Sequence, residues 1–305
     1  MISEAVSAIK IRNVFKNFGQ KTVLKDVTFD VPRGVIHGLI GHNGAGKTTL
    51  FRIILGLLKA SDGKIEIFGT ELSDQPYSKT QLGYVGENLG LYSSLSVRDN
   101  LIRFCRLYDI TDCTSLVEEI IVQLDLVEYR DTAIRKLSAG TKQRVAIARG
   151  MMGKPQLIIL DEFLQNIDPT WRHRLKEILI NQRNNGVTSL ISTHILGDVE
   201  ELCDYVTLIK EGEILFTGRI VGLYEKLKRK TISVKMSTSD NAKAYRVLDA
   251  YDVAEVDDAL LVTVDSREDI PRMTQMLLAK GLMLYETRIE KDSLETIYAK
   301  LHSSE

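Results

Sequence analysis

Hydrophobic residues fall into two repeating patterns over the first two thirds of the chain. Apolar runs typical of strands buried on both faces of a sheet occur at 35–40, 157–160, 187–192 and 205–209. Helical spacing follows the first run over 47–58 and fills the region from 96 to about 152 with several helices. Strands that alternate with helices predict an α/β fold with a mainly parallel sheet, whose ligand lies at the carboxyl ends of the strands.

The N-terminal segment predicts an antiparallel edge to this sheet. Apolar residues alternate at Ile9 and Ile11, and again over 27–31, on either side of a turn at 18–21. Phe18 is the aromatic residue best placed to stack on a purine base. The pattern favours a core position for this side chain almost as well.

The C-terminal third predicts a separate domain. A charged run at 226–230 indicates a helix end and a linker, which separates a first domain, residues 1–225, from a second one, residues 231–305. The expected order in the second domain is β-α-β-β-α-β, with its second helix behind a Ser266 cap and a further helix over 292–301. This order predicts a small ferredoxin-like α+β domain. Its sequence contains no catalytic constellation.

A glycine-rich segment between the first buried strand and its helix carries the most specific chemical signal. It reads GHNGAGKTT and fits the phosphate-loop pattern G-x-x-x-x-G-K-[ST]. Its glycines are expected to adopt positive φ and to turn backbone N–H groups toward a phosphate at a helix N-terminus. Lys47 would add a charge near the β and γ phosphates, and Thr48 would take one magnesium position. The predicted nucleotide contacts in this loop are Gly41, His42, Asn43, Gly44, Ala45, Gly46, Lys47, Thr48 and Thr49.

Polar residues with catalytic potential follow two other buried strands. Asp161 ends one strand, where it would hold magnesium, and Glu162 would polarise an attacking water as general base. A helix cap is the alternative for this acidic pair. His194 ends the next strand, and as a lone histidine it also fits a purely structural position. Ser138 predicts the N-cap of a helix over 142–151, whose free N–H groups would form an anion site.

In their order along the chain, these motifs resemble the ATP-binding subunit of an ABC transporter over residues 8 to about 222. The resemblance implies a P-loop domain with a helical subdomain at about 96–152, ATP as substrate, and Mg²⁺ held by Thr48, Glu87 and Asp161. It assigns catalysis to Glu162 and His194. It also implies that Ser138, Gly140 and Asp168 act on a nucleotide shared with a second ATP-binding subunit, most simply an identical chain.

The resemblance also implies a membrane partner and a cargo class. A tail of about 80 residues after the ATP-binding domain resembles bacterial exporters of drugs and antimicrobial peptides, including bacitracin and lantibiotic immunity systems. Such subunits work on the inner face of the cell membrane with an integral membrane permease. Leu89, Leu91 and Tyr92 form an apolar patch that would contact the permease, with a local core as an equal alternative.

Three positions depart from the family pattern. Glu87 stands where glutamine is usual, which brings a carboxylate near a phosphate of the same sign. Either Glu87 approaches only with the metal, or Asn88 replaces the glutamine. Ala139 and Thr141 replace a glycine and the glutamine of the usual Leu-Ser-Gly-Gly-Gln signature. The segment 163–167 lacks the usual Pro-Thr and glycine, so the loop before Asp168 is expected to be stiffer or differently placed.

Composition argues against several other classes of protein. Lys and Arg total 40 against 41 for Asp and Glu, so binding to nucleic acid is not expected. The three cysteines have no metal-ligand spacing, and we expect them to be reduced and buried. The sequence predicts no secretory signal and no membrane-spanning stretch, so we expect a membrane role to need another chain. The alternatives are a soluble ABC-type ATPase, which usually contains a long coiled coil or two such domains, and a regulatory subunit with weak turnover.

Overall fold

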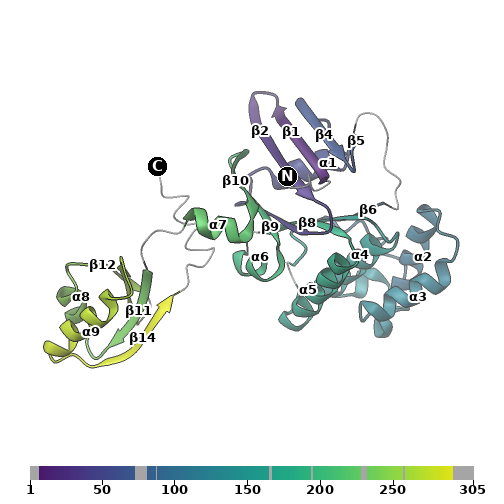
Figure 1. Cartoon of the computed structure of the whole chain (residues 1–305). Helices are drawn as coiled ribbons and strands as arrows, with labels where there is room; N and C mark the ends of the chain where they lie inside the picture. Colours follow the sequence, from purple (N-terminus) through teal and green to yellow (C-terminus); the bar gives the residue numbers. More distant parts are fainter. Residues whose placement is uncertain are drawn as a thin grey trace. The chain divides into compact units, whose positions relative to one another are not determined.

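The computed structural model describes residues 7–72, 81–86, 88–164, 167–193, 195–227, 232–256 and 258–290. The chain divides into two compact units, with the boundary in the sequence between Ile220 and Val221 (Figure 1). Each unit has its own hydrophobic core.

A six-stranded sheet forms the centre of the first unit, in the order β10-β9-β3-β8-β7-β6. Neighbouring strands are parallel except for β10, which pairs antiparallel with β9. All residues of β3, β7 and β8 are buried, which confirms the mainly parallel sheet predicted from the apolar runs. The strands are β3 (Ile36–Ile40), β6 (Leu82–Val85), β7 (Leu157–Asp161), β8 (Thr188–Thr193), β9 (Tyr205–Lys210) and β10 (Glu213–Arg219).

The N-terminal strands form a sheet of their own and not an edge of the parallel sheet. Its order is β2-β1-β4-β5, and all of its pairings are antiparallel. The strands are β1 (Ser7–Phe18), β2 (Lys21–Pro32), β4 (Asp62–Ile67) and β5 (Thr70–Glu71). The predicted turn at 18–21 is confirmed, because Phe18 pairs with Lys21.

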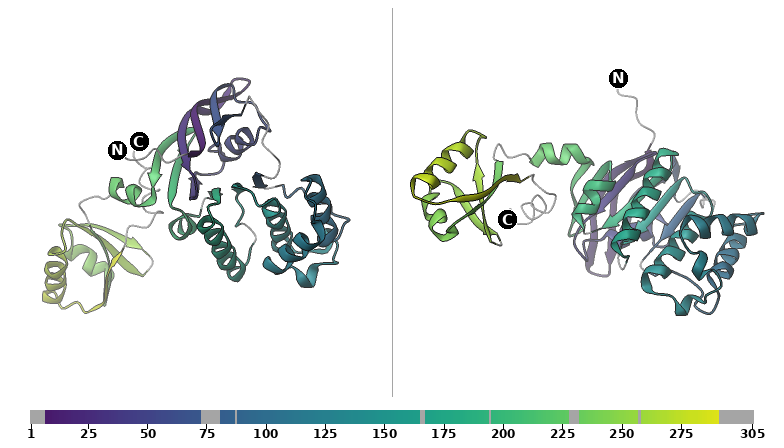
Figure 2. Two further views of the ribbon diagram at one scale, coloured as in Figure 1. Left: turned by 45° about the vertical axis from the view of Figure 1, so that its right-hand side comes forward. Right: turned by 90° about the horizontal axis from the view of Figure 1, so that it is seen from below.

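Helix α1 (Lys47–Ile54) joins the two sheets through one hydrophobic core. Its Leu50 and Phe51 are fully buried in a cluster that contains Ile9 of β1 and Leu190 of β8. Helices α5 (Pro169–Asn184) and α6 (Leu196–Leu202) also pack on β3 and β8. In β3, Leu39 belongs to the α1 core, whereas the adjacent Gly38 lies against Val199 of α6. Because neighbouring strand residues point to opposite faces, α1 and α6 cover opposite sides of the sheet (Figure 2).

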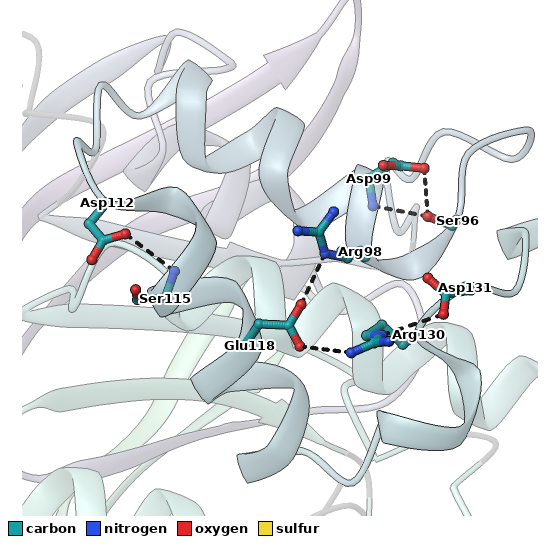
Figure 3. Close-up of polar contacts among 8 residues, drawn as sticks. All are labelled: Ser96, Arg98, Asp99, Asp112, Ser115, Glu118, Arg130 and Asp131. Atoms are coloured by element: carbon teal, nitrogen blue, oxygen red, sulfur yellow. Dashed lines mark hydrogen bonds and ion pairs between the residues drawn. The ribbon is translucent and has the colours of Figure 1, made fainter.

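The expected helical subdomain contains α2 (Val97–Leu107), α3 (Cys113–Gln123) and α4 (Ala139–Met151), with short 3₁₀ turns at Val127–Tyr129 and Ile134–Lys136. Figure 3 shows how polar contacts hold its first two helices. Ser96 and Asp112 cap them, each accepting a backbone N–H three residues on. Glu118 of α3 accepts from Arg98 of α2 at 2.9 Å and from Arg130 at 3.4 Å, which joins three segments of the subdomain.

The cysteines correct one expectation from the sequence. Cys105 near the end of α2 and Cys113 at the start of α3 form a disulfide, with their Cα atoms 5.6 Å apart. Only Cys203 is a free thiol among the three, and its burial raises its pKa well above the usual range. The two cysteines are eight positions apart in sequence, and the turn between α2 and α3 brings them together.

The second unit has the ferredoxin-like topology that its element order predicts. Its antiparallel sheet has the order β12-β13-β11-β14, and α8 and α9 pack against it. After α7 (Ile220–Leu227) come β11 (Ile232–Thr238), α8 (Asn241–Val247), β12 (Asp252–Val256), β13 (Ala259–Val264), α9 (Asp269–Ala279) and β14 (Leu284–Glu290).

The prediction that Ser266 caps α9 is wrong, because Glu268 occupies the N-cap position and makes no side-chain capping bond. Ser266 instead closes the preceding turn, where its hydroxyl accepts from the Glu268 N–H at 3.2 Å. The helix expected over 292–301 lies outside the described residues.

Candidate nucleotide site

The phosphate loop needs glycine for two different physical reasons. Gly44 and Gly46 have φ angles of 85° and 107°, a region that side chains disfavour. Gly41 does not have positive φ, so that expectation is wrong for this residue. A Cβ on Gly41 would instead lie 2.5 Å from the backbone oxygen of Ile209. The close approach of strand β9 therefore excludes any larger residue at Gly41.

Lys47 is held at the mouth of the loop by three oxygen atoms. This residue begins α1 and is only 5% exposed. Its Nζ donates to the carbonyl oxygens of Gly41 at 2.7 Å and His42 at 3.2 Å. It also lies 3.3 Å from a carboxylate oxygen of Glu162. The cation thus connects the loop to the carboxyl end of β7.

Asp161 and Glu162 are fixed by the same hydroxyl group. Ser192, on the adjacent strand β8, donates its Oγ–H to Asp161 Oδ1 at 2.5 Å. The same oxygen accepts the backbone N–H of Glu162 at 2.8 Å. Glu162 has a φ of 48°, an uncommon conformation for a residue with a side chain, and this hydrogen bond helps to hold it. The register of β7 and β8 therefore gives the two adjacent carboxylates different partners, with Asp161 at Ser192 and Glu162 at Lys47.

The geometry fits a magnesium ion beside Asp161. Its carboxylate is 1% exposed, and Oδ2 is buried with no hydrogen-bond partner among the described residues. A buried anionic oxygen without a partner is costly unless a cation binds it, and carboxylates and hydroxyls are ligands that Mg²⁺ prefers. Thr48, half-buried at the start of α1, would supply the hydroxyl. The acid pair is therefore not a helix cap but the end of a buried strand.

An open cleft of about 700 Å³ lies beside the phosphate loop, and Asp161 is not among the residues that line it. One part of the cleft is lined by Glu162 and by six residues of the phosphate loop and α1: Asn43, Gly44, Gly46, Lys47, Thr48 and Thr49. The remainder comes from β2 and the turn after β9, through Lys21, Thr22, Val23, Lys25 and Glu211. Sequence reasoning missed this second group. The two lysines of the predicted hairpin were the available signal, because cations near a phosphate loop favour an anionic ligand.

Phe18 is not among the residues that line the cleft. The side chain is 50% exposed, and Lys16 Nζ lies 4.9 Å from its ring centre. The core alternative for Phe18 is therefore wrong. Its stacking on a purine stays a prediction.

Comparison with known proteins places this geometry in a family. The ABC transporter family pattern matches residues 24–165. The lantibiotic transport ATP-binding protein SrtF of Streptococcus pyogenes is 35% identical over 68% of this chain and 89% of its own length. The bacitracin transport ATP-binding protein BcrA of Bacillus licheniformis is 30% identical over 96% of each chain. The chain belongs to the ABC transporter family.

A solved ATP-binding subunit of an ABC transporter supports the same assignment from the fold. It superposes with a TM-score of 0.67 at 30% identity, covering 72% of this chain and 93% of that chain. The protein is thus an ABC transporter ATP-binding subunit, of a family whose members hydrolyse ATP to drive transport. No helix among the described residues is long and apolar enough to cross a membrane.

The signature segment of this ABC subunit begins α4 through Ser138. Its Oγ accepts the N–H of Thr141 at 3.2 Å, which confirms the predicted N-cap. The Thr141 hydroxyl lies 2.9 Å from the same oxygen, so the threonine that replaces the usual glutamine strengthens this cap. Neither Ser138 nor Gly140 lines the cleft of its own chain. Their predicted action on the nucleotide of a second chain remains a proposal.

Packing explains the described residues of the unusual segment after Glu162, whereas residues 165 and 166 lie outside the described part of the chain. Phe163 is fully buried, and Leu164 and Ile167 are nearly so. The carbonyl oxygen of Phe163 accepts from Gln143 of α4 at 3.2 Å, which ties this segment to the signature helix. Asp168 caps α5 by accepting the Trp171 N–H at 3.0 Å. Its proposed role near a nucleotide comes in addition to this structural one.

Two predicted site residues, Glu87 and His194, lie outside the described residues. Asn88, the alternative to Glu87, uses its Oδ1 to accept the N–H of Gly90 at 3.1 Å. That oxygen therefore already stabilises the turn after β6.

The segment expected to contact a permease is anchored to the helical subdomain. Tyr92 is 37% exposed, and its ring centre lies 5.6 Å from that of Phe104. The guanidinium carbon of Arg103 lies 4.4 Å from the centre of the Tyr92 ring. The carbonyl oxygen of Leu89 accepts from Arg149 at 2.6 Å. Leu89 and Leu91 are half-buried. The patch is therefore partly local core and partly accessible surface.

Proposed function

We propose that this chain is the ATP-hydrolysing motor of an exporter for an antimicrobial peptide, drug or similar hydrophobic cargo, which passes through a separate membrane permease. The observation that carries the motor assignment is the convergence of Lys47, Asp161 and Glu162 at the phosphate loop. The cargo class rests on the similarity to a bacitracin and a lantibiotic transport protein. We place the subunit at the cytoplasmic face of the cell membrane.

Each residue of the site has a separate task in this proposal. The loop N–H groups and Lys47 hold the β and γ phosphates at the start of α1. Asp161 and Thr48 hold Mg²⁺, which when bound neutralises charge on the phosphates. Glu162 accepts a proton from the attacking water as general base. The predicted roles of Glu87 as a metal ligand and of His194 beside the γ-phosphate complete this set.

The ion pair between Lys47 and Glu162 suggests how substrate binding activates the base. When a phosphate binds the ammonium group of Lys47, the ion pair with Glu162 is lost, and the carboxylate can accept a proton from water. Its location, 16% exposed beside the cleft, is compatible with both arrangements. The base is therefore coupled to occupancy of the phosphate loop.

Catalysis would be completed by a second, identical chain. Ser138 and Gly140, at the N-terminus of α4, would press on the γ-phosphate of the other subunit. Asp168, in the segment that Gln143 ties to α4, would couple the two sites. ATP binding would close the pair, hydrolysis would reopen it, and the patch around Leu91 and Tyr92 would transmit the movement to the permease.

Purification from membranes tests the proposal. The wild-type chain is expected to co-purify with an integral membrane protein and to show magnesium-dependent ATPase activity. Vesicles that contain the complex should accumulate a labelled bacitracin-type peptide in the presence of ATP. An active chain that co-purifies with no membrane protein would favour the soluble ATPase, and absence of turnover in the complex would contradict the motor assignment.

A further inference from the structure

Strand β14 ends the sheet of the C-terminal unit and exposes apolar side chains. Among the described strands it pairs only with β11, so its other side is an edge of the sheet (Figure 1). Tyr285 is 66% exposed, Ile289 is 41% exposed, and Met283, just before the strand, is 61% exposed. An edge strand presents backbone donors and acceptors that can pair with another chain. Exposed apolar residues on such an edge add a reason for pairing.

The sequence of β14 is complementary to itself. Two copies that pair antiparallel about Thr287, the middle residue of Leu284–Glu290, place Glu286 opposite Arg288 of the second copy. Both residues lie in the part of β14 that pairs with β11 in regular register, whereas a register shift next to Glu286 leaves Tyr285 outside that part. Pairs of opposite charge are favourable across antiparallel strands. Symmetry produces the Glu286–Arg288 pair twice, as expected for an interface that joins identical surfaces.

The pairing of β14 with β11 shows on which face of the sheet the charged residues lie. Arg288 lies opposite Lys235 of β11, and Glu286 lies opposite Ser237. These charged residues share the face of Lys235, whereas Thr287 lies opposite Met236, which is buried in the core. The same face of each sheet is therefore covered by helices after pairing.

The opposite edge of the sheet lacks this complementarity. Strand β12 has two acidic residues, Asp252 and Glu255, and no basic one. Its self-pairing about Ala254 would place each carboxylate opposite a valine. Edge strands are commonly protected by charge against association, and β12 follows that pattern. The contrast selects β14 as the edge that accepts another strand.

We propose that β14 is a docking surface for a second copy of this chain. Two β14 strands pair antiparallel about Thr287 and join the two four-stranded sheets into one. This contact involves no nucleotide, so it is distinct from the ATP-dependent pairing in the proposed function and holds whether or not that pairing occurs. It would keep two motor subunits together while their nucleotide sites open.

Charge exchange in the full-length chain tests the pairing. The mass of the nucleotide-free protein is measured by sedimentation equilibrium, and a dimer is expected. Arg288→Glu or Glu286→Arg alone places like charges opposite each other twice, so dimerisation should weaken about tenfold or more. The double exchange Glu286→Arg with Arg288→Glu restores the opposite pairs and should recover the wild-type dissociation constant within about threefold. A folding defect in a single variant would not produce that recovery.

Two further measurements separate this contact from the nucleotide-dependent one. Thr287→Cys should give a disulfide-linked dimer under mild oxidation, whereas the matched edge variant Val256→Cys on β12 should not. Lys47→Ala should abolish ATP binding and leave the nucleotide-free dimer unchanged. A monomer without nucleotide, or a double exchange that fails to restore association, would overturn the proposal without affecting the ATPase assignment.

Discussion

Lys47 Nζ lies 3.3 Å from Glu162 Oε1, so the cation of the phosphate loop neutralises the proposed general base. The two side chains are 5% and 16% exposed, and solvent screens this pair less than it would a surface pair. In the proposed mechanism, their contact links the step of phosphate binding to the step of water activation.

Replacement of Glu162 by glutamine should separate binding from turnover. Glu162→Gln retains size and removes proton acceptance, so kcat for ATP should fall by about 10²–10⁴-fold while ATP still binds. Steady-state ATPase assays and nucleotide titration measure the two effects. Glu211→Gln, which also alters a carboxylate that lines the cleft, is the matched control and should retain most activity. Equal turnover in both variants would exclude Glu162 as the base.

Ser192→Ala should weaken both stability and magnesium use. The change removes a donor to Asp161 and an acceptor for the Glu162 N–H, in a fully buried location. Loss of such buried hydrogen bonds costs about 1–3 kcal/mol of unfolding free energy, and the magnesium concentration for half-maximal ATPase should rise. Ser189→Ala on the same strand is the control, because the Ser189 hydroxyl has no hydrogen-bond partner in the described part of the chain. Denaturant unfolding of both variants decides the point.

The surface around Tyr92 should be needed for transport and not for hydrolysis by the isolated chain. Replacement of Leu91 and Tyr92 with Asp places charge on the patch and should reduce peptide transport by about tenfold or more, since a buried unpaired charge costs an interface several kcal/mol. Transport into vesicles and ATPase activity of the purified chain are measured in parallel. Unaltered transport would show that the permease docks elsewhere.

His37 should make the first unit less stable in mild acid. Its ring is fully buried between Phe29 and Tyr205, its Nε2 lies 2.8 Å from Thr207 Oγ1, and burial lowers its pKa to about 3. The unfolded chain binds a proton near pH 6.5 and the folded chain does not, so stability falls as pH decreases through that value. Between pH 6.5 and 5.5 the loss should be about 1 kcal/mol. Urea unfolding of His37→Gln should lack this component.

The Cys105–Cys113 disulfide should stabilise the helical subdomain under oxidising conditions. Closing a short loop reduces the entropy of the unfolded chain, by an amount equivalent to about 2–3 kcal/mol. Cys113→Ser should therefore lower the melting temperature of oxidised protein and have little effect on protein treated with a reductant. Mass spectrometry after alkylation of the unreduced chain would establish the bond, and three alkylated cysteines would contradict it.

Local sequence patterns determined the main elements of this protein. The apolar runs at β3, β7 and β8 required strands buried on both faces, and the sequence from Ser138 onward required a helix cap. The pattern from Gly41 to Thr49 required a phosphate-binding turn, since few other backbones need glycine and lysine at those positions. These features depend on residues close in sequence, so a linear pattern contains them.

Tertiary structure decided the features that depend on residues distant in sequence. The chain alone did not show that Ser192 bonds both Asp161 and Glu162, because the register of β7 and β8 sets that contact. It also did not show that the backbone of Ile209 excludes a side chain at Gly41, or that β2 supplies Lys21 and Lys25 to the cleft. Nor did it show that the turn between α2 and α3 brings Cys105 to Cys113. Strand order and helix packing bring these groups together, and a local hydrophobic pattern specifies which face is buried without specifying what covers it.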